Sequence, residues 1–273
     1  MPEPFLWNPT RSSFAVAWCC SSHARNSDGV AKNLGRIGLI PSHRSNRSGS
    51  GGSISPMPEA APPVRPLLRG WIHLVAFFVS IPAGVALVLL AHTATARAAA
   101  AIYALSLTAV FGASAAYHRV RWSPKANRRM KRLDHSMIFL LIAGSYTPIS
   151  ILVLHGTWSV VILSIAWAGA ALGIILKLAR IDGLHVVTGI LYMGLGWLAA
   201  IALPQLIRGM TLSQLLLMVT GGLLYTAGAI VFASRRPDPS PATFGFHEVW
   251  HAFMVAAAAC HFTMIALVLR SVS

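Results

Sequence analysis

The segment FHEVWHAFMVAAAACHFTMIALVL, residues 246–269, contains a single charged side chain, Glu248. A helix that crosses a bilayer needs roughly 20 consecutive, mostly apolar residues, so this segment predicts a membrane helix. Six further apolar runs of similar length precede it, and their connections are short. We therefore expect an all-α membrane protein, a seven-transmembrane helix bundle within residues 66–273. The seven runs lie at about 70–91, 98–118, 133–154, 157–177, 184–204, 211–233 and 246–269.

The composition supports the same class of protein. Of the 273 residues, 55% are hydrophobic and 11% are charged, and the mean hydropathy is +0.64, which is well outside the range of soluble domains. The formal net charge of +15 reflects scarce acids, with 22 Lys+Arg against seven Asp+Glu. The basic residues lie in the tail and in loops, with no basic helix or aromatic stacking motif. We expect the lipid bilayer as partner and no nucleic acid.

Residues 1–65 differ from the rest of the chain. The stretch HRSNRSGSGGSISP, residues 43–56, is rich in Ser, Gly and Arg and has no apolar periodicity, which predicts a disordered basic tail. The tail is basic and poor in acids like a transit peptide, but it lacks an evident amphipathic helix. We favour the simpler interpretation that the start codon is assigned too early, with Met57 as the true start.

The basic residues of the loops predict the orientation in the membrane. The loop after the second run, RVRWSPKANRRMKR, residues 119–132, carries seven, and the loops after the fourth and sixth runs carry two each. The loops after the first, third and fifth runs carry one, none and one. One set of loops thus carries eleven basic residues and the other carries two. This excess predicts a cytoplasmic N-terminus, a C-terminus outside, and a multi-pass location in the cell membrane (plasma or inner).

Carboxylates are rare in the apolar runs. Asp134 opens the third run and Glu248 opens the seventh, and no Asp or Glu lies near mid-membrane. Because proton-coupled transporters use buried carboxylates, this distribution argues against such a relay. The seventh run also lacks the lysine that a retinal Schiff base would require.

Several histidines reach one predicted end of the bundle. His118 lies in the last turn of the second run, Asp134 in the first turn of the third, and His247 and His251 in the first two turns of the seventh. A spacing of four places His247 and His251 on one helix face, and Ser114 on the face of His118. Three imidazoles and a water make a tetrahedral Zn²⁺ site with one open position. Asp134 would ligate or hydrogen-bond there, and Ser114 would hold a water.

The same residues admit simpler interpretations. The histidines could bond lipid headgroups or loops, Asp134 could be a charge favoured at a helix N-terminus, and Ser114 could be a small packing residue.

Other polar residues are expected to have lesser roles. His135 is expected at the interface, because it points about 100° away from Asp134. His73 and His261 are expected to line the interior, and Glu248 to point to the polar edge of its helix.

The pattern HEVWH, residues 247–251, matches the H-E-x-x-H of zinc proteases. Such proteases take a third ligand from further along the chain. No acid follows His251, and position 257, where a third histidine would fall, is Ala257. His261 lies about 15 Å further along the helix than His251. The third ligand must therefore come from upstream, from His118, and the motif does not predict a protease.

The chain resembles the hemolysin III family of bacterial membrane proteins. The resemblance rests on Ser114 with YHRV, residues 117–120, on LDHSMIFLLIAGSYTPI, residues 133–149, and on FHEVWHAFMVAAAACHF, residues 246–262. That family is similar to the progestin and adipoQ receptors and, more distantly, to the alkaline ceramidases. The resemblance covers about residues 69–269 and leaves the tail outside.

The resemblance implies seven helices, a cytoplasmic N-terminus and zinc near the cytoplasmic face. It implies that His118, His247 and His251 bind the metal and that Asp134, with Ser114 beside it, holds the water there. Three functions stay open. The first is zinc-dependent hydrolysis of a lipid amide or ester, with Asp134 as proton acceptor. The second is a non-enzymatic receptor or channel with structural zinc, and the third is a pore-forming (hemolytic) protein.

Overall fold

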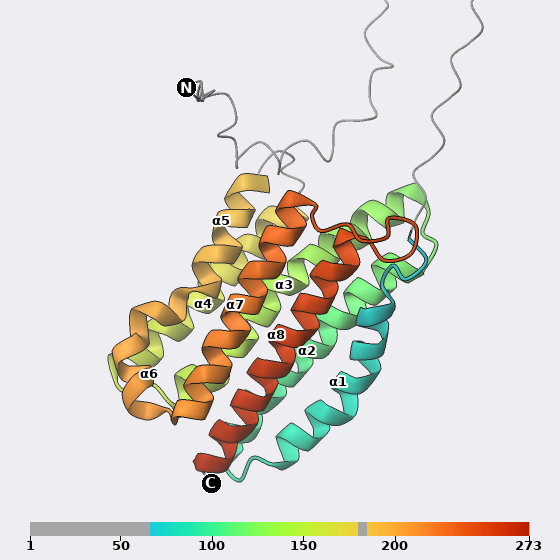
Figure 1. The fold of residues 1–273 in the computed structure, drawn as a ribbon. Helices are drawn as coiled ribbons and strands as arrows, with labels where there is room; N and C mark the ends of the chain where they lie inside the picture. The colour runs from blue at the N-terminus through green and yellow to red at the C-terminus, as the bar shows by residue number, and fades with distance from the viewer. Residues whose placement is uncertain (1–65, 180–184, 273) are drawn as a thin grey trace, which may run out of the picture.

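The computed structural model describes residues 66–179 and 185–272, so the predicted tail lies outside the described residues. Within these described ranges, seven helical segments are long and apolar enough to cross a membrane, which confirms the predicted all-α fold. They lie side by side as a bundle (Figure 1). The elements are α1 Trp71–Leu89, α2 Ala94–Arg119, α3 Pro124–Leu152, α4 Thr157–Leu178, α5 His185–Gly196, η2 Leu198–Ala202, α6 Leu203–Gly209, α7 Leu212–Ser234 and α8 Phe246–Ser271.

Helix α3 begins earlier than its apolar run. The run was expected from residue 133, but the helix starts at Pro124, because the Ser123 side chain accepts the N–H of Ala126 and Pro124 suits the first helical position. The predicted basic loop is therefore helical from Pro124, so the expectation of no basic helix was wrong. Asp134 lies about three turns inside α3 and not in its first turn.

The fifth span is broken, although residues 184–204 were expected to form one helix. Helix α5 ends at Gly196, and η2 and α6 complete the crossing. The hydroxyl of Tyr146 in α3 donates to the carbonyl of Gly196 (3.2 Å) and accepts the N–H of Ala199 (2.8 Å). A neighbouring helix thus pairs the backbone groups that the break releases, as a membrane interior requires.

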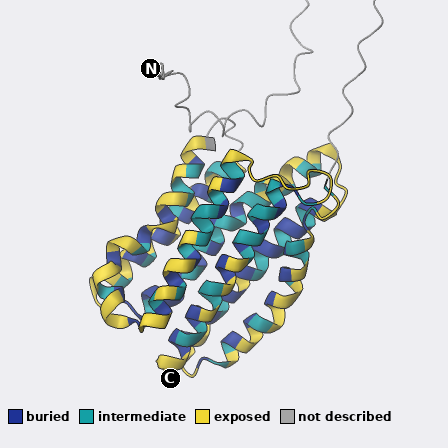
Figure 2. Cartoon of the chain, viewed as in Figure 1, coloured by how far each residue is buried: buried dark blue, intermediate teal, exposed yellow. Residues whose placement is uncertain are grey.

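Helices α2, α3 and α8 form the interior of the bundle. In the most apolar window of each span, 56% of the residues of α2 and of α3 and 39% of those of α8 are buried, against 22% in the other four. Exposed residues lie on the outward faces and at the ends (Figure 2). Most of the buried polar side chains are on α2, α3 and α8. Polar groups therefore lie where protein, and not lipid, surrounds them.

A short strap, residues 66–70, covers one end of the bundle. The N–H groups of Leu67 and Leu68 donate to the carbonyls of Ala242 (3.0 Å) and Thr243 (3.1 Å), so the segment before α1 pairs with the connection before α8 (Figure 1). Gly70 ends the strap with a φ of +78°, and a Cβ there would lie 2.6 Å from the Cβ of His118. The strap therefore packs directly on the end of α2 that carries His118.

Candidate metal centre

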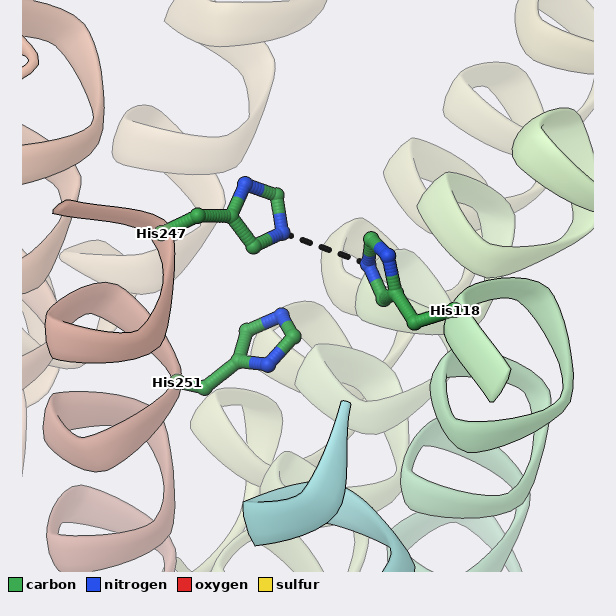
Figure 3. A group of neighbouring side chains, drawn as sticks. All are labelled: His118, His247 and His251. Carbon is green, nitrogen blue, oxygen red and sulfur yellow. Dashed lines mark hydrogen bonds between the residues drawn. The ribbon is translucent and has the colours of Figure 1, made fainter. Parts of the chain in front are cut away.

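Three histidines meet beneath this strap. Helix α8 presents His247 and His251 one turn apart, and His118 reaches them from the last turn of α2. One nitrogen from each ring lies within 4.8 Å of the others. Figure 3 shows the rings facing one another, with the Nε2 atoms of His118 and His247 3.2 Å apart. The predicted convergence is confirmed, and the three side chains lie close enough to bind a metal ion.

The donor set and its spacing suit zinc. Tetrahedral zinc with Zn–N bonds of ~2.0–2.1 Å separates two ligand nitrogens by about 3.3 Å. The 3.2 Å between His118 and His247 is close to that value. His118 and His251 are buried, at 8% and 2% exposure, as a shielded site requires.

Asp134 and Ser114 form a pair beside the histidines. The carboxyl group of Asp134 in α3 interacts with the hydroxyl of Ser114, which is buried one turn from His118 in α2. The group of three that could hold an ion consists of imidazoles alone. The structure thus brings Asp134 and Ser114 together, as neighbours of the histidines rather than as members of the group.

His73 of α1 also reaches this centre, which the sequence did not predict beyond an interior position. Its Nδ1 lies 2.7 Å from the Oγ of Ser114, and its ring stacks on that of His251 at 3.8 Å between centroids and 15° between planes. A signal was available in the sequence. His73 lies near the start of the first predicted span, and the predicted topology places that start at the same end as the other histidines.

Glu248 was expected at a polar edge, and that expectation was wrong. The side chain is fully buried, its Oε2 accepts the N–H of Gly245 (2.9 Å), and its Oε1 lies 3.0 Å from the Nε of Arg69. The strap covers the first turn of α8, so the residue has protein on every side. This carboxylate holds the start of α8 to the strap, a structural role that accords with the rejection of the protease motif.

Two other polar regions lie apart from the centre. His261 contacts α7, with its Nε2 3.2 Å from the carbonyl oxygen of Met218. A cavity of about 440 Å³ opens at the opposite end of the bundle, and His155, Arg208 and Gln214 are among its lining residues. None of the predicted site residues lines this cavity.

These features define a multi-pass helical membrane protein with a buried histidine centre at one end. The family described as Haemolysin-III related matches residues 63–262, and the chain belongs to that family. It is 33% identical over 193 residues to Hemolysin-3 of Bacillus cereus, covering 70% of this chain and 85% of that protein. A Hemolysin-3 homolog of Bacillus subtilis (strain 168) is 29% identical over 193 residues, covering 70% and 87%.

A more distant similarity extends to animals. The human monocyte to macrophage differentiation factor is 28% identical over 174 residues, which cover 60% of this chain and 67% of that protein. The resemblance drawn from the sequence motifs is therefore confirmed at the level of the family.

Proposed function

We propose that this protein is a zinc-dependent membrane hydrolase that cleaves an amide or ester bond of a lipid. One observation carries the proposal: nitrogen atoms of His118, His247 and His251 lie within 4.8 Å of one another, beside the paired side chains of Asp134 and Ser114. Three imidazoles leave one tetrahedral position for water or substrate, which is the ligand set of catalytic rather than closed structural zinc sites.

The chemistry divides between the ion and the chain. Zinc, when bound, would polarise a carbonyl and lower the pKa of water. A carboxylate oxygen of Asp134 would accept the proton that the attacking water loses and later return it to the leaving group. Ser114 would orient the Asp134 carboxylate through their contact. The apolar helices around the centre suit a substrate with acyl chains.

The proposed location is the cytoplasmic side of the cell membrane. The excess of basic residues in three connections supports a cytoplasmic N-terminus. The strap, the first turn of α8 and the basic start of α3 lie at one end of the bundle (Figure 1). The histidine centre would then face the cytoplasmic leaflet, and the C-terminus of α8 would lie outside.

The burial of His118 and His251 favours a second candidate, in which the metal is structural. The protein would then be a non-enzymatic receptor, channel or pore. The two candidate functions differ in whether the fourth coordination position of the metal accepts a substrate.

Metal content and turnover test the two candidates together. Protein purified in detergent without chelator is compared with His247→Ala/His251→Ala by elemental mass spectrometry. The matched control is His92→Ala/His155→Ala, which removes two exposed histidines at the opposite end. We expect one zinc in the wild type and the control, none in the double variant, and hydrolysis of ceramide or phospholipid by the zinc-loaded forms alone.

Two other outcomes would change this conclusion. Zinc without hydrolysis of either lipid class would favour the structural candidate. Folded wild-type protein that stays free of zinc after supplementation would overturn both.

A further inference from the structure

His73 joins the metal-binding histidines to the Asp134–Ser114 pair. It is 2% exposed, and it comes from α1, a helix that supplies none of the three grouped nitrogens. Its ring makes two contacts of different kinds. One is the near-parallel stack on His251, and the other is the 2.7 Å approach of Nδ1 to the Ser114 hydroxyl.

The stack matters because His251 lacks the usual means of fixing its ring. A metal-binding histidine almost always donates its second ring N–H to a carboxylate, a carbonyl or water, which sets the orientation of the imidazole. The Nδ1 of His251 is buried and has no hydrogen-bond partner among the described residues. Packing must therefore fix the plane of this ring, and the His73 ring lies flat against it.

The second contact fixes His73 itself and extends the network. The hydrogen bond between its Nδ1 and the Ser114 hydroxyl holds the His73 imidazole in one orientation. The same hydroxyl meets the Asp134 carboxyl group. A single chain of contacts thus runs from His251 through His73 and Ser114 to Asp134, across helices α8, α1, α2 and α3.

We propose that His73 is a positioning residue of the metal centre. It holds the His251 ring by stacking and the Ser114 hydroxyl by hydrogen bonding, without binding the ion. This assignment rests on the proposed function, because it requires that the histidine group holds a metal.

Two substitutions separate the two contacts. His73→Ala removes both, whereas His73→Phe keeps an aromatic ring against His251 and loses the hydrogen bond to Ser114. The control is His261→Ala, which removes another buried histidine, one that bonds a carbonyl of α7 outside the centre. Affinity for Zn²⁺ is measured by chelator competition, and the ligand field by the visible absorption of the Co²⁺-substituted protein.

We expect His73→Ala to weaken Zn²⁺ binding by about 10–100-fold, the usual effect of removing a partner that orients a ligand, and to shift the Co²⁺ bands. His73→Phe restores most of the affinity, while its hydrolysis stays low because the Ser114 hydroxyl has lost its hydrogen bond to His73. His261→Ala leaves affinity and spectrum unchanged. If His73→Ala does not fold, His73→Phe and the matched His73→Leu still separate stacking from simple filling of space.

Three results would overturn the assignment. Unchanged affinity and spectrum in a folded His73→Ala protein would show that His73 does not position His251. A fall in the number of metal-bound imidazoles from four to three, measured by X-ray absorption, would make His73 a ligand. Absence of metal from the wild type would overturn the proposed function as well, so the two failures are distinguishable.

Discussion

The two ends of the bundle use similar residues in different ways. At the strapped end, His73, His118, His247 and His251 are turned inward from helices, and all three carboxylates of the described residues lie there. These are Asp134, Asp238 and Glu248. At the opposite end, His92 and His155 lie in exposed connections, and no carboxylate occurs among the described residues.

The difference shows that residue type alone does not make a site. Histidines at the opposite end can be solvated one by one, so nothing holds them together. At the strapped end, most of these side chains are buried beneath the strap and between the inner helices, and buried polar groups are stable only when they pair with one another. If the strapped end depends on this enclosure, substitutions there should affect activity and stability more than substitutions elsewhere.

The largest effect is expected from Asp134→Asn, which would remove the proposed proton acceptor and preserve the size of the side chain. Hydrolysis should fall by about 10²–10⁴-fold, the usual contribution of a positioned general base. Zinc content should stay at the wild-type value, because Asp134 is outside the group of three nitrogens. Lipid hydrolysis and metal content are measured on one preparation. Full activity in the variant would remove Asp134 from the mechanism.

The buried ion pair of the strapped end should dominate local stability. Glu248→Leu removes the carboxylate that contacts both Arg69 and the Gly245 N–H, and removing one member of a buried pair costs about 3–5 kcal/mol. We expect the lower part of that range, because the Arg69 side chain is 20% exposed. Denaturant unfolding in detergent measures the free energy of unfolding.

The double variant Arg69→Met/Glu248→Leu sharpens this test. It should lose less stability than the sum of the two single variants, because neither charge is left without a partner. Strict additivity would mean that the two residues do not interact.

Two glycines provide a matched comparison between the ends. Gly70 and Gly156 both have positive φ, +78° and +59°, but a Cβ on Gly156 meets nothing within 4 Å. Gly156→Ala should therefore cost only the backbone strain, of order 1–3 kcal/mol for a sparsely populated backbone conformation. Gly70→Ala adds a collision with His118 and should also weaken zinc binding several-fold. Equal zinc affinities in the two variants would show that the strap does not set the position of His118.

The smallest effect is expected for Tyr146→Phe, near the break in the fifth span. The change removes both hydrogen bonds to the released backbone groups, and interhelical hydrogen bonds in membranes contribute about 0.6 kcal/mol on average. A loss of roughly 1 kcal/mol, with zinc content unchanged, is expected in thermal unfolding. A fall in zinc content would indicate that the fifth span supports the strapped end.

The number of membrane spans and the core of the histidine centre could be predicted from the sequence. Each span is recognisable in the sequence, because a bilayer requires a continuous apolar run. A spacing of four residues necessarily places His247 and His251 on one helix face. The rejection of a downstream third ligand pointed to His118. The early start of α3 was also readable, from Ser123 followed by Pro124.

The distant residues that complete that centre became visible only in the folded structure. The contact between His73 and Ser114 joins positions 41 residues apart, and the burial of Glu248 depends on Arg69 in a strap that no local spacing announces. The break after Gly196 likewise depends on a hydroxyl from α3. Local patterns specify helices and their faces, whereas contacts between helices depend on how those faces pack, which no single segment encodes.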